Sequence, residues 1–142
     1  MIGVIVSGHG SFAAGMASAL HLLAGPPENF RVVDFRQEDT IDDLEFRLRD
    51  CIREMNACTG ILILTDIYEG APFREAVEMK DKLAGEQRIE VVGGLNLGML
   101  MQVNLARGYI SDVTDLADIA LDEGRKQIQK YVYSEPDADY GG

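Results

Sequence analysis

The sequence has little that would build a metal centre, a disulfide framework or a membrane anchor. Only two cysteines occur in 142 residues, Cys51 and Cys58, and no histidine lies near them. This spacing suggests neither a zinc site nor a disulfide, so we expect two buried thiols in a reducing compartment. The longest apolar stretch, from 91 to 103, is interrupted by glycines and falls short of the ~20 residues that a membrane helix needs. No charged segment followed by an apolar core opens the chain, so we expect a cytoplasmic protein without membrane insertion.

Basic residues are also scarce. The chain has 13 lysines and arginines and 24 aspartates and glutamates, which gives a net charge of -11. Such a charge opposes binding to nucleic acid or anionic lipid and favours a partner with a basic face, although many acidic surfaces are simply solvated. The length fits a single domain with one core. We expect this domain to span residues 1–133, followed by a mobile acidic tail at 134–142.

Four short β-rich runs alternate with longer segments of helical periodicity. The runs are Ile2 to Val6, Phe30 to Phe35, Gly60 to Thr65 and Arg88 to Leu95. This alternation is typical of βαβ units and a parallel sheet. The third run is apolar at four successive positions, as in a central strand that is covered on both faces. We therefore predict a single doubly wound α/β domain with a mainly parallel sheet, and we take the order 2-1-3-4 from the flavodoxin-like type of this fold.

Start and stop signals bound the predicted helices. Thr40 with Asp43 resembles a capping box, Pro72 suits a first helical position, and Gly85 is expected to end the helix that Pro72 begins. Asn96 is expected to cap a helix that runs to Gly108, and a last helix is expected from about 112 to 129. The Tyr131-Val132-Tyr133 stretch that follows is predicted to form a short strand.

A histidine between two glycines is the most informative feature of the chain. His9 follows the first predicted strand, and Asp66 follows the third. In the order 2-1-3-4 these strands are neighbours, and a crevice opens between their carboxyl ends. An aspartate bonded to one ring N–H would fix the tautomer and turn the lone pair of the other ring nitrogen outward. The pair therefore favours a nucleophilic histidine.

Glycines and helix starts surround this pair. Gly8, Gly10 and Gly70 and the first turns of two helices offer backbone N–H groups that suit a phosphate. The chemistry indicated is phosphoryl transfer through phosphohistidine. Taken singly, a histidine in a glycine turn and an aspartate after a strand would be read as capping residues. Together, on adjacent strand ends, they favour the functional interpretation.

The remaining candidates carry weaker signals. His21 lies off the apolar face of the first helix and is given no role. Arg74 is placed to meet a phosphate or a partner, whereas Glu69 would repel a phosphate unless it points away. Met99, with Leu100 and Val103, is expected in the core. Gly93-Gly94 matches neither a P-loop nor a dinucleotide motif, so we expect no nucleotide, metal or other cofactor.

Several motifs in order resemble one known family. They are Ile5-Val6-Ser7-Gly8-His9-Gly10, Ala13-Ala14-Gly15-Met16, Leu64-Thr65-Asp66, Gly70-Ala71-Pro72-Phe73 and Val92-Gly93-Gly94-Leu95-Asn96-Leu97 with Met99-Leu100. The chain is similar to the enzyme IIA component of the mannose-type (mannose, fructose, sorbose and gluconate-like) sugar phosphotransferase system. The similarity runs from residue 1 to about 130. It does not identify the sugar, because membrane components of the system select it.

The resemblance implies a role for each site residue. His9 would accept a phosphoryl group from phospho-HPr and pass it to a histidine of a IIB component, with Asp66 orienting the ring. The resemblance also implies a homodimer that exchanges a C-terminal edge strand, for which Tyr131 to Tyr133 is the candidate. No fused IIB domain follows in the sequence, so the IIB partner is expected to be a separate polypeptide.

Two positions depart from the family pattern. Ala71 replaces a serine whose hydroxyl would bond the phosphate, so phosphate binding would depend more on the backbone N–H groups of Gly10, Gly70 and Ala71. Gly98 replaces a frequent proline at the start of a helix.

Three other functions stay open on sequence grounds. The chain also resembles the phosphocarrier subunit of a dihydroxyacetone kinase, which uses an N-terminal histidine. Gly8-His9-Gly10-Ser11 resembles the start of small tetrapyrrole metal chelatases, although only His21 is available as a second histidine ligand. A non-catalytic regulatory module with an acidic docking surface is the third.

Overall fold

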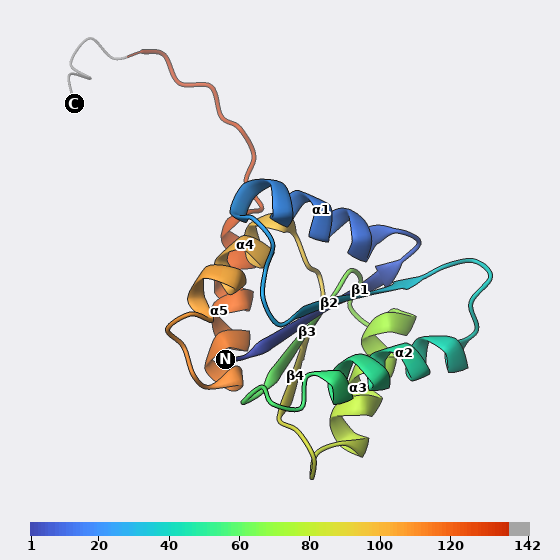
Figure 1. Ribbon diagram of the computed structural model, residues 1–142. Coiled ribbons are helices and arrows are strands. Elements are labelled where there is room, and N and C mark those ends of the chain that lie inside the picture. Colours follow the sequence, from blue (N-terminus) through green and yellow to red (C-terminus); the bar gives the residue numbers. More distant parts are fainter. Residues whose placement is uncertain (137–142) are drawn as a thin grey trace.

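The computed structural model describes residues 1–136 and contains four strands and five helices in that part of the chain. Figure 1 shows a central sheet between two layers of helices. The strands are β1 (Gly3–His9), β2 (Phe30–Phe35), β3 (Ile61–Thr65) and β4 (Ile89–Val92). The helices are α1 (Phe12–Ala24), α2 (Ile41–Glu54), α3 (Ala71–Lys82), α4 (Leu97–Ala106) and α5 (Val113–Lys126).

The sheet is parallel and has the order β2-β1-β3-β4, which confirms the predicted fold class and strand order. Ser7 of β1 is the register partner of Thr65 of β3, and His9 is the register partner of Phe35 of β2. All five residues of β3 are buried, as expected for a strand with helices on both faces. The carboxyl ends of β1, β2 and β3 therefore meet at one edge of the sheet.

Two apolar cores lie on opposite faces of the sheet. Helices α1, α4 and α5 cover one face, and α2 and α3 cover the other (Figure 1). Met99, Leu100 and Val103 belong to the first core, which confirms their predicted structural role. The sheet thus separates α1 from α3, the two helices that begin next to the carboxyl ends of β1 and β3.

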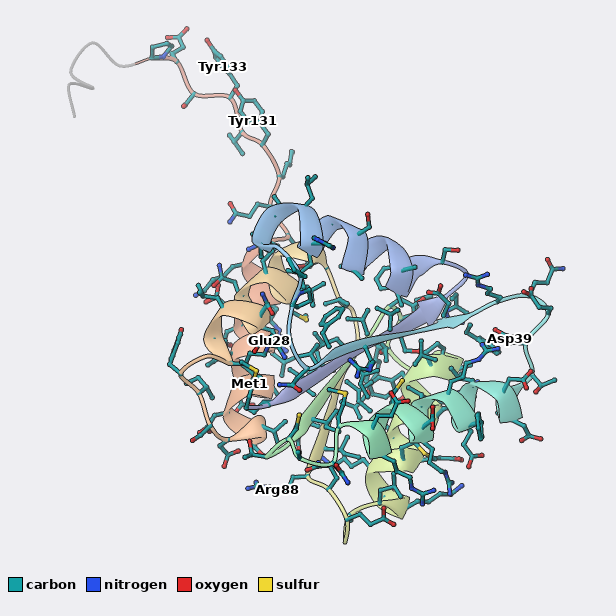
Figure 2. All side chains as sticks on the ribbon, viewed as in Figure 1. Met1, Glu28, Asp39, Arg88, Tyr131 and Tyr133 are labelled. Atoms are coloured by element: carbon teal, nitrogen blue, oxygen red, sulfur yellow. The ribbon has the colours of Figure 1, made fainter. Side chains whose placement is uncertain are left out.

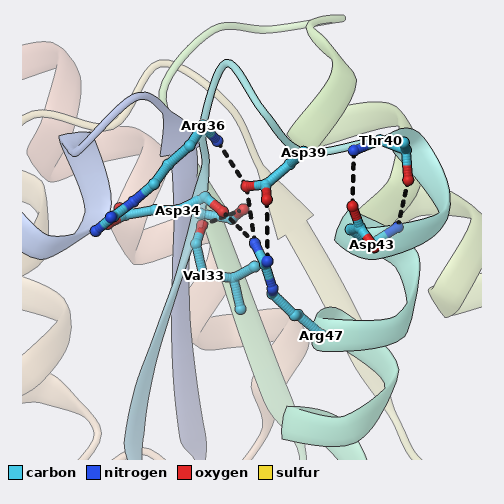
Figure 3. Close-up of polar contacts among 8 residues, drawn as sticks. Val33, Asp34, Arg36, Asp39, Thr40, Asp43 and Arg47 are labelled. Carbon is cyan, nitrogen blue, oxygen red and sulfur yellow. Dashed lines mark hydrogen bonds and ion pairs between the residues drawn. The ribbon is translucent and has the colours of Figure 1, made fainter.

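The loop between β2 and α2 is fixed by polar contacts (Figure 3). The Asp39 carboxylate accepts hydrogen bonds from the Arg36 backbone N–H at 2.8 Å and from the Arg47 guanidinium at 2.8 and 3.0 Å. The predicted capping box is present, because the Thr40 hydroxyl accepts the Asp43 N–H and the Asp43 carboxylate accepts the Thr40 N–H. These contacts hold the end of β2, and so Phe35, at a defined position.

Arg107 contacts the backbone at the amino ends of β1 and β2, at the other end of these strands from His9. Its guanidinium is buried and donates to the carbonyl oxygens of Ile2, just before β1, and of Glu28 and Asn29, just before β2. Burial lowers the pKa of this guanidinium from its ordinary value. Its acceptors are backbone carbonyls and the Asn104 amide oxygen rather than a carboxylate, so the sequence gives no ion-pair signal for it.

Several predicted boundaries differ from the observed ones. Helix α3 ends at Lys82, and the predicted stop residue, Gly85, lies within the turn at 83–86 that follows it. Strand β4 is shorter than predicted, and α5 ends at Lys126. Cys51 and Cys58 are half-buried free thiols, and burial raises the pKa of Cys51 to about 11.

The C-terminal segment differs most from expectation. Tyr131 to Tyr133 form no strand in the single chain, and their side chains are exposed on a segment that leaves the body after α5 (Figure 2). Of the predicted tail, residues 134–136 are exposed without regular structure and 137–142 lie outside the described residues. No helix within residues 1–136 has the length and apolar character needed to cross a membrane.

Candidate functional site

The site is centred on His9 and Asp66, which the fold brings into direct contact. The His9 Nδ1 lies 2.8 Å from Asp66 Oδ2, and the His9 backbone N–H donates to the same oxygen at 2.8 Å. The second carboxylate oxygen accepts the Ile67 N–H at 2.8 Å. One carboxylate at the end of β3 therefore fixes both the backbone and the ring of the last residue of β1.

Hydrogen bonds keep Asp66 ionised and set the tautomer of His9. The Asp66 side chain is only 9% exposed. Burial by itself would raise its pKa, but hydrogen bonds from the His9 backbone, the His9 ring and the Ile67 N–H outweigh burial and lower the pKa from the ordinary 3.8. An ionised carboxylate only accepts hydrogen bonds, so we assign the ring proton to Nδ1. The lone pair of His9 is then on Nε2.

The His9 ring lies against Gly70, the residue that precedes α3. A Cβ built on Gly70 would lie 3.0 Å from His9 Cε1, so the ring packs directly on the Gly70 backbone. Cε1 stands between the two ring nitrogens, with Nδ1 held by Asp66. Nε2 is therefore on the side of the ring that borders the amino end of α3. The φ of Gly70 is -71°, so close approach rather than backbone conformation requires glycine here.

The three amides expected to bind phosphate are in different states. The Gly10 N–H donates to the Phe35 carbonyl at 2.7 Å, and the Gly70 N–H donates to the Ile67 carbonyl at 3.1 Å. Within residues 1–136 the Ala71 N–H has no hydrogen-bond acceptor, as is usual for the first residue of a helix. The partial positive charge of a helix amino end favours an anion at that position.

Phe35 and Gly8 also shape the site. The Phe35 ring meets the His9 ring edge-on, with centroids 6.1 Å apart and an interplanar angle of 63°. A Cβ on Gly8 would lie 2.5 Å from the Phe12 ring and 3.0 Å from Asp66 Cγ. Sequence reasoning did not single out Phe35, although its place at the end of the strand next to β1 was a usable signal. Phe35 thus contacts the His9 ring, and the absence of a side chain at Gly8 leaves room for Asp66 next to β1.

The surroundings of His9 are open and partly apolar. The His9 side chain is 45% exposed. Ile67 and Tyr68, in the loop between β3 and α3, are 59% and 67% exposed, and Tyr68 stacks edge-on against Phe73. Exposed apolar side chains next to a functional group are typical of a surface that binds another protein. The ring is thus accessible to a macromolecule.

The other candidates lie outside this contact. His21 is exposed on α1. Glu69 is exposed and has a φ of 68°, a left-handed conformation that favours glycine. Arg74 lines a hollow between α2 and α3. No group of three or more histidine, cysteine, aspartate or glutamate side chains suited to a metal ion occurs among the described residues, so the ligand set of a chelatase is not found there.

Comparison with known proteins identifies the family of the chain. The profile of the EIIA-man family, described as PTS system fructose IIA component, matches residues 3–121. The PTS system fructose-specific EIIA component of Bacillus subtilis is 28% identical over 111 residues, which cover 78% of this chain and 74% of that protein. The crystal structure of a phosphotransferase system component EIIA from Streptococcus agalactiae superposes with a TM-score of 0.85 at 31% identity, covering 92% of this chain and 97% of that one.

A longer relative matches over only part of its length. The PTS system mannose-specific EIIAB component of Escherichia coli K12 is 24% identical over 128 residues, which are 90% of this chain but 39% of that protein. The profile match covers most of the chain, and a solved structure above 30% identity aligns over nearly all of it. The chain therefore belongs to the EIIA-man family, the mannose-family EIIA phosphotransferase components of the sugar phosphotransferase system.

Proposed function

We propose that the protein is a cytoplasmic phosphocarrier that accepts a phosphoryl group on His9 from phospho-HPr and passes it to a IIB component. The observation that carries this proposal is the 2.8 Å contact between His9 Nδ1 and Asp66 Oδ2, which leaves Nε2 as the free nucleophile. The half-exposed position of His9, beside the exposed Ile67 and Tyr68, suits exchange with another protein.

The transfer follows from the tautomer. The Nε2 lone pair of His9 attacks the phosphorus of the donor phosphohistidine, and the bond between that phosphorus and the donor nitrogen breaks with its electron pair returning to the donor ring. Nδ1 keeps its proton, and the positive charge that develops on the His9 ring is stabilised by the Asp66 carboxylate. The same steps in reverse deliver the phosphoryl group to the acceptor histidine.

The phosphoryl oxygens would be held by backbone amides. The Ala71 N–H at the amino end of α3 is the first of these, since Nε2 borders that helix end and this amide has no acceptor among residues 1–136. Gly70 and Gly10 would contribute after exchanging their present carbonyl partners for phosphate oxygens. Charge-assisted hydrogen bonds of this kind favour the exchange.

The first prediction is that phosphorylation requires His9. We expect wild-type protein, incubated with phosphoenolpyruvate, enzyme I and HPr, to gain one acid-labile phosphate, and His9→Ala to gain none, because the nucleophile is gone. Intact mass spectrometry measures both. The matched control is His21→Ala, which removes the other histidine and should be phosphorylated like wild type.

A wild-type chain that stays unmodified while HPr itself is phosphorylated would refute the proposal. If wild-type protein is phosphorylated, it is next offered a IIB component and, separately, a dihydroxyacetone kinase. Transfer to the kinase alone would replace the sugar system by the related kinase phosphocarrier role.

The second prediction concerns Asp66. We expect Asp66→Asn to slow phosphoryl transfer to His9 by roughly 10²- to 10⁴-fold, because an amide neither stabilises the positive ring nor enforces the Nδ1–H tautomer. Rapid-quench kinetics measures the rate. A lowered pKa means that the carboxylate is charged above the ordinary value of 3.8 and loses its charge only as the pH falls through the still lower folded value.

The Asp66 carboxylate should therefore add no inflection of its own to the wild-type rate profile between about pH 5 and pH 8. Asp34→Asn is a comparison variant, because Asp34 lies near the same edge of the sheet but bonds the Ala14 N–H of α1 instead of His9. An Asp66→Asn rate equal to that of wild type would contradict the orienting role.

The proposal extends to a homodimer that exchanges C-terminal strands. Among residues 1–136, strand β4 has a neighbour on one side only, so its other edge offers backbone groups that no strand of the described part pairs. Tyr131, Val132 and Tyr133 have β-favouring side chains, are exposed, and form no strand in the single chain. Pairing of this segment with a β4 edge of a second chain would satisfy both.

The third prediction tests this exchange. Adjacent residues of a strand direct their N–H groups to opposite sides, so either Val132→Pro or Tyr133→Pro must remove a ladder hydrogen bond. We expect one of them to raise the dimer dissociation constant about tenfold or more. Sedimentation equilibrium measures it, and Val132→Thr, which keeps the N–H and β-branching, is the control. A monomeric wild type, or two proline variants that dimerise like wild type, would disprove the exchange.

A further inference from the structure

A hollow between α2 and α3 opens beside the His9 site. It has a volume of about 220 Å³ and is lined by Ile41, Ala71, Arg74, Glu75 and Glu78. Ala71, Glu75 and Glu78 recur at the spacing of one helical face. Ala71 follows Gly70, the residue against which the His9 ring packs. The hollow thus begins at the proposed phosphate position and continues along α3.

Glu75 is buried in the wall of this hollow, and one of its carboxyl oxygens is unpaired among the described residues. Glu75 as a whole residue is 9% exposed, and its Oε2 has no hydrogen-bond partner among the described residues. Burial, together with the neighbouring Glu78 and Glu45, raises the pKa of Glu75, while Lys82 opposes this effect. An unpaired buried carboxyl group destabilises a fold unless it gains a partner.

The cations of the chain near this group make no hydrogen bond or ion pair with it among residues 1–136. The Lys82 Nζ lies 3.6 Å from a Glu78 carboxylate oxygen and 3.9 Å from a Glu45 carboxylate oxygen, and the Lys80 Nζ lies 2.8 Å from a Glu90 carboxylate oxygen. Arg74 lines the same hollow, but its exposed guanidinium has no ion pair with Glu75. No metal-ligating group of three side chains occurs among residues 1–136. The open position therefore suits a long cationic side chain from outside.

We propose that this hollow receives a lysine or arginine side chain of the phosphoryl donor when the donor docks on His9. The inference rests on the proposed phosphocarrier function and adds a docking contact to it. Glu75 lies four residues along α3 from Ala71, about 6 Å along the helix axis, so one docked protein can reach both positions. Ile41 offers an apolar surface to the aliphatic stem of the incoming side chain.

Charge favours this occupant. The net charge of -11 attracts a partner with a basic face, and a cation in the hollow would pair with a carboxylate that is already shielded from water. The exposed Ile67 and Tyr68 would supply the apolar part of the same interface. The buried acid would thus lower the stability of the free protein and strengthen its complex.

The test is Glu75→Gln, which keeps the shape of the side chain and removes its charge. We expect the KM for phospho-HPr to rise about tenfold with kcat within twofold of wild type. The variant should withstand at least as much urea as wild type, because the unpaired acid is gone. Asp118→Asn is the matched control: it makes the same charge change on the exposed surface of α5, on the other face of the sheet, and should leave KM unchanged.

A second measurement reads the contact directly. The carboxyl carbon of Glu75, followed by NMR, should titrate at a lower pH when unphosphorylated HPr is bound than in the free protein, because the incoming cation favours the charged form. A KM equal to that of wild type, or an unchanged titration with HPr bound, would overturn the docking contact alone. If wild-type protein takes no phosphate from phospho-HPr, the phosphocarrier function fails and the contact falls with it.

Discussion

A single carboxylate oxygen organises this site. Asp66 Oδ2 accepts both the backbone N–H and the ring Nδ1–H of His9, each at 2.8 Å. The backbone bond joins the end of β1 to the end of β3 beyond the last ladder pair, and the ring bond fixes one tautomer and one orientation. Because the same oxygen makes both contacts, the position of the His9 ring is fixed relative to the ends of β1 and β3.

The doubly wound fold makes this arrangement possible. Strands β1 and β3 are adjacent, but the helices that follow them lie on opposite faces, so no helix covers the carboxyl ends of both. Two glycines leave the space that the site needs. A side chain at Gly8 would collide with Asp66, and one at Gly70 would collide with the His9 ring next to the amino end of α3. The result is a half-exposed His9 ring between the Asp66 carboxylate and the amino end of α3, where the Ala71 N–H has no acceptor among residues 1–136.

Local patterns in the sequence were sufficient for the parallel α/β fold and the capping of α2, because both depend on periodicity or on neighbouring residues. The strand order was taken from the fold type, and given that order, the positions of His9 and Asp66 at strand ends predicted their pairing. Other features depend on packing between distant elements. Phe35 meets His9 through strand register, and Glu75 is buried by the contact of α3 with α2. The Arg107 guanidinium donates to carbonyl oxygens of three separate residues. Tyr131 to Tyr133 have the sequence pattern of a strand, but they pair with no strand within residues 1–136.

We propose that Asp66 leaves Nε2 of His9 free for the phosphoryl group. This is tested by ³¹P and ¹⁵N NMR of protein that carries ¹⁵N-labelled histidine and has been phosphorylated through HPr, with His21→Gln leaving His9 as the one labelled ring. We expect phosphorus coupling to Nε2 and a proton retained on Nδ1. Phosphorylation on Nδ1, the nitrogen that contacts Asp66, would contradict this proposal.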